Sequence, residues 1–415
     1  MLRLRASARR CSRVLFGGGC LLMSGIDGRG SARLVSHPGD TMTVEAAQAQ
    51  PFSHTGKFFN VLGLALKNAG LTIVTLTLYR FWARTSMRRR LWSRAWVMGD
   101  PLEYTGSAWE LVRGFLIALP TFFLPWVFVF YIAPLMMNPV TAAWLGFGFW
   151  VLLVPLIAAA RYWMRRYQLS RTRWRGIRMG LAGSAWGFAF ASWGWWVLQV
   201  LSLGWYTPAA RMNRAKLMWE NTRFGDQPFE FVDDGQSRQK GLWGPFALGW
   251  FSFPIAYLAS AFVVAFALIG MGLGGVFTPD PAGEPSEPDV AAIVAVVAAF
   301  GFAFLFTVLL CWAPYNAASM NRIAGLISID GARFRLKART FSLFFVTLAG
   351  WLITIFSLGL LAPVAGFLQI RYVMNRLEII GAPKFAEIGQ PVIEGPSAGE
   401  SLGDAFDLDM GVGVI

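Results

Sequence analysis

The sequence has very few of the side chains from which metal centres and disulfide frameworks are built. It contains two histidines, His37 and His54, and three cysteines among 415 residues. The cysteines form no CxxC pair, which argues against a zinc site or a disulfide framework. No nucleotide-binding, metalloprotease or serine-hydrolase motif occurs in a context that would support chemistry. We therefore expect neither an enzyme nor a metal site nor a bound cofactor.

Charged residues are also scarce, and long stretches lack them altogether. Only 14% of the residues are charged and 55% are hydrophobic, whereas a soluble domain has about 25% charged residues. Several uncharged stretches exceed the roughly 20 apolar residues that a helix needs to cross the hydrocarbon layer of a membrane. These stretches are residues 114–160, 182–210, 245–279, 290–321 and 340–370. The first is long enough for two crossings, with a turn at Asn138 and Pro139.

The uncharged stretches predict an all-α, multi-pass membrane protein that folds as a helical bundle. The predicted membrane domain covers residues 52–390. Its apolar segments are expected at residues 58–82, 114–137, 141–160, 182–210, 246–276, 290–315 and 340–370. Residues 1–41 are interpreted as the result of a start codon assigned too early, with Met42 as the first residue, or as a signal peptide. The acidic, glycine-rich end, residues 391–415, is predicted to be disordered.

Three parts of the chain resemble one another and predict an internal repeat. They contain LTIVTLTLYRFWAR, WWVLQVLSLGWYTPAAR and WLITIFSLGLLAPVAGF. Each joins an apolar helix, a Ser/Thr-Leu step and an arginine-bearing stretch, and each is followed by a glycine, at Gly99, Gly225 and Gly381. Two further stretches, LSRTRWRGIRM and ISIDGARFRLK, predict small cytoplasmic β segments, because polar and apolar residues alternate in the second.

The charges between the apolar segments predict an orientation but also create a conflict. Residues 161–181 contain seven arginines and no acid, whereas residues 280–289 contain four acids and no base. Cytoplasmic loops of membrane proteins are rich in basic residues, so these two loops should lie on opposite sides. Strict crossing by every repeated segment contradicts that arrangement. Either each repeated segment is a re-entrant or interfacial hairpin, bent near Lys67, Gly194 and Gly350, or all segments cross and the charge rule fails.

The stretch TLTLYRFWARTSMRRRLWSRAWVMGDPLEYTGSAWELVRGF resembles the YjgN family of bacterial inner-membrane proteins, which are defined by a domain of unknown function. The resemblance continues through RTRWRGIRMGLAGSAWGFAF and MNRAKLMWENTRFGD and ends near RYVMNRLEIIG, so that it covers roughly residues 52–390. The third repeated part departs from the pattern, because it lacks the Tyr-Arg-Phe-Trp cluster. The resemblance implies an inner-membrane location and no established activity.

The strongest local cluster of candidate site residues follows the first apolar helix. Arginines at i, i+4 and i+8 lie on one face of a helix, and Tyr and Trp are typical of the membrane surface. Candidate ligand or lipid-headgroup residues are Arg80, Arg84, Arg88, Arg89, Arg90 and Lys67. Candidate interfacial anchors are Tyr79, Trp82 and Trp92. The cluster is interpreted either as a site for an anionic lipid or substrate on the cytoplasmic surface or as an anchor that fixes topology.

The net charge of +14 would suggest nucleic acid as the partner of a soluble protein. Here the basic residues lie in short loops beside apolar segments, so we expect a lipid bilayer with anionic lipids as the partner, and no nucleic acid. The predicted location is the cell inner membrane. Two functions remain open: a transport or channel-type protein for a small solute, and a non-transporting protein that binds lipid or scaffolds a partner complex.

Overall fold

The computed structural model describes residues 49–232, 237–270, 290–381 and 388–389. The predicted leader (1–41), the acidic turn (280–289) and the acidic tail (391–415) therefore lie outside the described residues.

Short strands form one antiparallel sheet that is nearly closed into a barrel. Their hydrogen-bonded order is β7-β6-β5-β4-β3-β2-β1-β11-β10-β9-β8, so strands that follow one another in the chain are neighbours and β1 pairs with β11. The two end strands, β7 and β8, are separated only by Phe229. The strands are β1 (Ala49–His54), β2 (Ala95–Val97), β3 (Asp100–Tyr104), β4 (Thr172–Trp174), β5 (Ile177–Leu181), β6 (Thr222–Phe224), β7 (Gln227–Pro228), β8 (Glu230–Phe231), β9 (Ile327–Ile329), β10 (Ala332–Leu336) and β11 (Leu377–Ile380).

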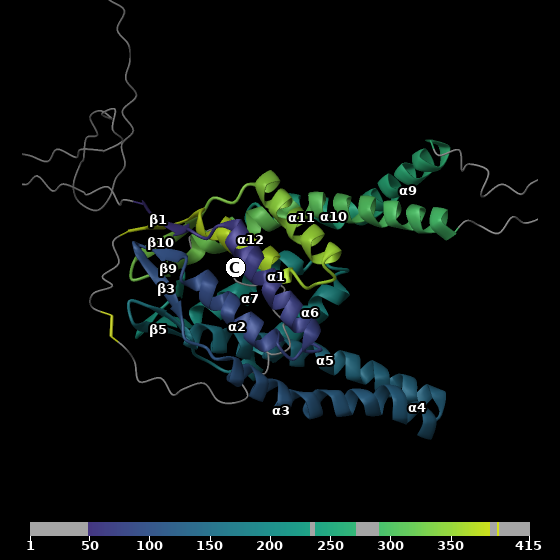
Figure 1. The fold of residues 1–415 in the computed structure, drawn as a ribbon, viewed down its shortest axis with the longest axis horizontal. Helices are drawn as coiled ribbons and strands as arrows, with labels where there is room; N and C mark the ends of the chain where they lie inside the picture. Colours follow the sequence, from purple (N-terminus) through teal and green to yellow (C-terminus); the bar gives the residue numbers. More distant parts are fainter. Residues whose placement is uncertain (1–48, 233–236, 271–289, 382–387, 390–415) are drawn as a thin grey trace, which may run out of the picture.

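Helical hairpins connect every second pair of neighbouring strands, and all of them leave the same edge of the sheet (Figure 1). Tight turns connect the strands at the opposite edge. Three hairpins are short: α1 (Phe58–Val74) with α2 (Arg80–Trp92), α6 (Ala185–Leu201) with α7 (Thr207–Glu220), and α11 (Thr340–Phe356) with α12 (Ala362–Met374). Each short hairpin begins and ends on paired strands, so its two ends lie on the same side of the molecule.

Two hairpins are long and extend past the short ones as two arms (Figure 1). The first contains α3 (Ala108–Val127), a π-helical turn at Phe128–Ile132, α4 (Ala133–Met136) and α5 (Pro139–Ser170). The second contains α8 (Trp243–Trp250), α9 (Ser252–Gly270) and α10 (Val290–Leu326). In the described part of the chain, three helical segments are long and apolar enough to cross a membrane, and the pair α8–α9, bent by 42°, makes a fourth if it is one span.

The tips of the three short hairpins have the same local geometry. A leucine adopts a positive φ in each, with values of 48° at Leu76, 50° at Leu203 and 49° at Leu358. The Ser or Thr before that leucine accepts a hydrogen bond from the backbone N–H four residues later, at 2.9 to 3.0 Å. The Ser/Thr-Leu steps in the sequence are therefore the turns between paired helices.

The prediction that the repeated segments bend near their middles is wrong. The helices α1, α6 and α11 continue through Lys67, Gly194 and Gly350, and the chain reverses at the Ser/Thr-Leu steps instead. The middle residues hold the paired helices together. Asn68 donates a hydrogen bond of 3.3 Å to the Ala83 carbonyl on α2, and a Cβ at Gly350 would lie 3.2 Å from the Ala365 Cβ on α12.

The interior of the barrel is filled with apolar side chains. Phe52 of β1 and Phe229 both contact Phe334 of β10, with ring centroids 6.2 and 6.1 Å apart. Trp174 and Phe224 form a similar contact at 5.5 Å. Helix residues such as Met212 and Phe246 belong to the same core, and Ile388 packs beside Gly225 in the turn between β6 and β7. The barrel is thus a packed core, as in other small barrels whose interiors are just wide enough for side chains.

The fold is mostly helical, as predicted, but it is not all-α. The predicted segments LSRTRWRGIRM and ISIDGARFRLK do form the hairpins β4–β5 and β9–β10. In β10, Arg333 and Arg335 are exposed whereas Ala332 and Leu336 are buried, which confirms the predicted alternation. The small β segments are parts of one large sheet, and most of its other strands are too short to leave a periodic pattern in the sequence.

Candidate functional site

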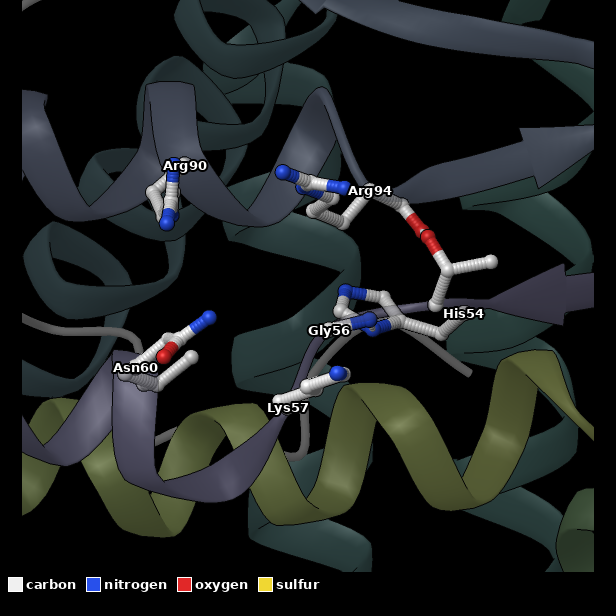
Figure 2. A pocket seen from close by; sticks show the side chains of 8 residues that line it. His54, Gly56, Lys57, Asn60, Arg90 and Arg94 are labelled. Carbon is white, nitrogen blue, oxygen red and sulfur yellow. Dashed lines mark hydrogen bonds between the residues drawn. The ribbon is translucent and has the colours of Figure 1, made fainter.

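A cavity of about 220 Å³ lies where the first short hairpin leaves the sheet. It opens between the start of α1 and the end of α2, and Figure 2 shows Lys57 and Asn60 on one side of it and Arg90 and Arg94 on the other. Its lining residues are His54, Thr55, Gly56, Lys57, Asn60, Val61, Arg90 and Arg94. We call this cavity the first-hairpin pocket.

The local sequence explains why the pocket forms at this place. Strand β1 ends at His54, and the loop through Gly56 turns directly into α1. Gly56 is buried, and a Cβ there would lie 2.6 Å from the Cε1 atom of His54, so no larger residue fits without displacing the imidazole. On the other side, Arg94 follows the end of α2, and its carbonyl accepts a hydrogen bond of 2.9 Å from the Thr55 N–H.

His54 holds the loop of the pocket in place as a neutral imidazole. Its Nδ1 atom lies 3.2 Å from the Gly56 N–H, which donates to it, and its Nε2 atom lies 3.2 Å from the Leu91 carbonyl. This pattern needs a proton on Nε2 and none on Nδ1. Burial, the largest cause, lowers the pKa of His54, and the charge of Arg371 lowers it further. The positive charge of the pocket therefore comes from the lysine and the two arginines.

The electrostatics of the pocket favour an anion. Lys57, Arg90 and Arg94 are exposed, and within the described residues none of their side chains forms an ion pair with a carboxylate. Residues 49–99 contain no Asp or Glu. The N–H groups of the first turn of α1 also point toward this end of the helix, where a partial positive charge develops. Three cations without a counter-ion around one cavity can hold a phosphate or carboxylate group.

The structure divides the predicted arginine cluster, and only Arg90 reaches the pocket. Arg80 packs on aromatic rings, with its guanidinium 4.9 Å from the ring centre of Phe81 and 4.8 Å from that of Phe115. Arg88 donates a hydrogen bond of 3.4 Å to the Tyr104 hydroxyl, and Arg89 donates one of 2.9 Å to the Gly106 carbonyl. Arg84 is half-buried on α2. Lys67 is exposed on α1, away from this cavity. Ligand binding by these five residues stays a prediction.

The predicted anchors also separate into two groups. Tyr79 and Trp82 stack on each other with ring centres 6.3 Å apart near the tip of the first hairpin, and Trp82 contacts Trp109 of α3. Trp92 lies at the other end of α2, where its indole N–H donates a hydrogen bond of 3.0 Å to the Thr172 hydroxyl of β4. Trp92 thus joins the hairpin to the sheet, and the anchor role of Tyr79 and Trp82 stays a prediction.

Sequence reasoning missed Lys57, Asn60, Arg94 and His54 as pocket residues. Lys57 and Arg94 are far apart in the chain and meet only because α1 and α2 start and end on the paired strands β1 and β2. One sequence signal for the pocket exists, since Gly56-Lys57 directly precedes an apolar helix that has no acid in its first turn. No group of three His, Cys, Asp or Glu side chains placed to hold a metal ion occurs in the part of the chain that the structure describes.

Comparison with known proteins identifies one family. Residues 49–405 match the family described as bacterial protein of unknown function, DUF898. No curated protein and no solved structure matches the chain.

Proposed function

This chain belongs to the DUF898 family of bacterial proteins of unknown function, and from that premise we propose that it is an integral protein of the inner membrane that binds a small anionic solute in the first-hairpin pocket. The single observation that carries the proposal is the pocket itself, in which Lys57, Arg90 and Arg94 surround one cavity without a carboxylate. The resemblance of the sequence to the YjgN family supports the inner-membrane location.

The exposed apolar side chains support the membrane placement. Large apolar residues cover the long hairpins, and Leu135 and Phe266 are 86% and 71% exposed. The tips of the short hairpins are apolar as well, with Leu358 92% exposed. Water would penalise so much exposed hydrocarbon, whereas lipid would not. We place the long hairpins across the bilayer and the tips of the short hairpins in its near leaflet.

The common edge of the sheet supports a cytoplasmic position for the sheet. Because all hairpins return to the same edge, the arginine-rich residues 161–181 and the basic residues 322–339 lie on one side, as the charge rule requires. The first of the two topologies considered above, in which the repeated segments return, is the one that fits this connectivity. The shared tip geometry supports an origin of the three short hairpins from one repeated unit.

Helix lengths give the height of the pocket relative to the membrane. The uncharged segment of α5 ends at Ala160, ten residues before the helix reaches the sheet at Ser170. At 1.5 Å per residue, the sheet edge lies about 15 Å below the hydrocarbon. The headgroup layer is only about 5 to 8 Å thick. The pocket at the sheet edge is therefore in water, where it meets solutes before it meets lipid headgroups.

A calorimetric titration of the full chain with inorganic phosphate in neutral detergent tests the proposal. We expect binding that weakens at least about tenfold in a Lys57→Gln/Arg94→Gln variant, since each charged hydrogen bond contributes about 1.5–3 kcal/mol. Arg223→Gln is the matched control, because Arg223 is an exposed arginine of β6 remote from the pocket. Absence of phosphate binding by the unmodified chain, or an equal loss in the control, would contradict the proposal.

Transport of the bound anion is the finer form of this proposal, and flux into liposomes tests it separately. We expect phosphate entry above that of empty liposomes, and its loss in the Lys57→Gln/Arg94→Gln variant. The second candidate function is a non-transporting lipid-binding protein. The observation in its favour is the aromatic cluster of Tyr79, Trp82 and Trp109 near the tip of the first hairpin. Flux identical to that of empty liposomes would favour this second function.

A further inference from the structure

A second basic cluster lies between the two long hairpins and is separate from the first-hairpin pocket. Arg211 and Arg214 project from α7, Arg161 projects from α5, and α10 contributes Tyr315 and Asn316. The cluster thus joins one short hairpin to both long ones. Neither the predicted arginine cluster nor the pocket includes any of these residues.

The arginines of this cluster are held by neutral groups. Arg211 donates a hydrogen bond of 2.9 Å to the Asn316 Oδ1 atom, and its guanidinium lies 5.4 Å from the ring centre of Tyr315. Arg214 donates from Nε to the Ala210 carbonyl of its own helix at 3.2 Å. Within the described residues, none of Arg161, Arg211 and Arg214 forms an ion pair with a carboxylate. These positive charges therefore lack a counter-ion among the described residues.

Arg161 and Arg211 both repel Arg214, and an anion bound between the three guanidinium groups would offset this repulsion. Burial first, and then repulsion from Arg161 and Arg211, lower the pKa of Arg214 from the ordinary value of an arginine. An arginine nevertheless stays protonated, so the repulsion persists in the folded protein. Arg161 is exposed, whereas Arg211 and Arg214 are half-buried, so an anion reaches the cluster from the surface at Arg161.

In the membrane placement proposed above, the cluster lies at the height of the membrane surface. Arg211 precedes the end of α7 by nine residues, and Arg161 precedes the end of α5 by nine residues, which places both about 14 Å above the sheet edge. Arg161 is also the first charge after the uncharged segment 141–160. Farther from the sheet, the exposed side chains of Leu152 on α5 and Leu203 at a hairpin tip lie at the height of acyl chains.

We propose that Arg161, Arg211 and Arg214 bind the phosphate group of an anionic phospholipid in the leaflet that faces the sheet. Guanidinium groups match the oxygens of a phosphate in pairs, and basic pockets between membrane helices on the cytoplasmic side bind anionic headgroups in other proteins. The lipid phosphate supplies the missing counter-ion, and it links α5 to α7 while Asn316 orients Arg211 from α10. The inference does not depend on the solute proposed for the first-hairpin pocket.

Titration of the delipidated full chain with short-chain phosphatidylglycerol tests this site, with short-chain phosphatidylcholine and inorganic phosphate as separate arms. We expect phosphatidylglycerol to bind at least about tenfold more tightly than phosphatidylcholine. An Arg211→Gln/Arg214→Gln variant should lose most of that preference. The control is Lys216→Gln on the same helix, because Lys216 already pairs with Glu220 at 3.5 Å. Its preference should be unchanged.

Arg161→Gln serves as the second variant, because Arg161 is exposed and its replacement leaves the packing of α7 intact. It should weaken phosphatidylglycerol binding severalfold without lowering the melting temperature. Equal binding of both lipids, an unchanged preference in both arginine variants, or an equal loss in Lys216→Gln would overturn the proposal. Displacement of phosphatidylglycerol by inorganic phosphate at the same concentration would also overturn it, because free phosphate would then be the ligand.

Discussion

The long and the short helical hairpins leave the same edge of one sheet but end at different heights. Helix α5 has 32 residues and α10 has 37, whereas α1, α6 and α11 have 17 each. At 1.5 Å per residue, the short helices rise about 25 Å and the long ones about 48 to 56 Å. In the membrane placement proposed above, the hydrocarbon begins about 15 Å above the sheet, so a short hairpin would enter it by only about 10 Å.

The difference teaches that apolar composition alone does not determine a crossing. Residues 340–370 form an uncharged stretch as long as a membrane span, yet the chain reverses within it at Ser357 and Leu358. The reversal depends on a hydroxyl that caps the next helix and on a residue with positive φ. Helices α5 and α10 instead continue without reversal through residues 141–160 and 290–321.

The largest expected effect comes from a charge placed at the centre of a long hairpin. Trp150→Arg on α5 should cost about 2.5–3.5 kcal/mol of insertion free energy, because Trp150 lies ten residues before Ala160 and the guanidinium would be about 15 Å inside the hydrocarbon, at the bilayer centre. Leu358→Arg at a short tip should cost much less, since the side chain can extend to the nearby membrane surface. The fraction of chain that resists alkaline extraction measures both. Equal losses would mean that the short hairpins reach as deep as the long ones.

The tips of the short hairpins provide a second, smaller test. Thr77 has φ of 73°, whereas Gly204 and Gly359 occupy the corresponding place in the other two tips with φ of 90° and 84°. A left-handed conformation costs an L-residue about 1–2 kcal/mol. We expect Thr77→Gly to stabilise the protein and Gly359→Thr to destabilise it by that amount, in thermal unfolding of the detergent-solubilised chain.

Gly359→Thr isolates the backbone conformation, because a Cβ at Gly359 would meet no atom within 4 Å. Gly366→Thr is the control, since Gly366 lies within α12 and is equally open. The account of the shared tip would be wrong if Thr77→Gly lowered the melting temperature.

Much of the helical part of this fold was predictable, whereas most of the sheet was not. The uncharged segments 114–137 and 141–160 correspond to helices, as predicted, because an uncharged stretch of about 20 residues is a strong sequence signal for a membrane helix. Six of the strands in the described residues have only two or three residues, and these carry too little pattern to detect. The pairing of β1 with β11 also joins residues about 330 positions apart, for example Ala49 and Ile380, which no local signal specifies.

The candidate site was only partly predictable for the same reason. The arginine-rich helix α2 drew attention to Arg90. Lys57 becomes a neighbour of Arg90 and Arg94 only because the chain reverses at the tip of the hairpin. The arginines of α7 and α5 meet through packing of separate hairpins. Of these charged residues, sequence reasoning singled out only Arg90, and the way the hairpins pack on the sheet decides which charges share a site.

The smallest expected effect is a pH dependence of stability that comes from His54, at the base of the first short hairpin. His54 is the only histidine among the residues that the structure describes, and burial lowers its pKa. The unfolded chain therefore takes up a proton near pH 6.5 that the folded chain resists, so stability is full above that pH and declines as the pH falls below it. We expect the melting temperature to fall slightly between pH 7.5 and about pH 5.5, and this slope to be reduced in His54→Gln. An unchanged slope in the variant would exclude His54 as its source.

The sidedness of the strand turns tests the central claim, that all hairpins return to one side, most directly. Single cysteines at Gly176, Glu230 and Gly283, in a chain whose own three cysteines are replaced, are labelled with an impermeant maleimide in intact cells and in inverted vesicles. The account predicts that positions 176 and 230 label only in inverted vesicles and position 283 only in intact cells. Labelling of positions 176 and 230 from opposite sides would contradict it, because α6 and α7 would then make a single crossing between them.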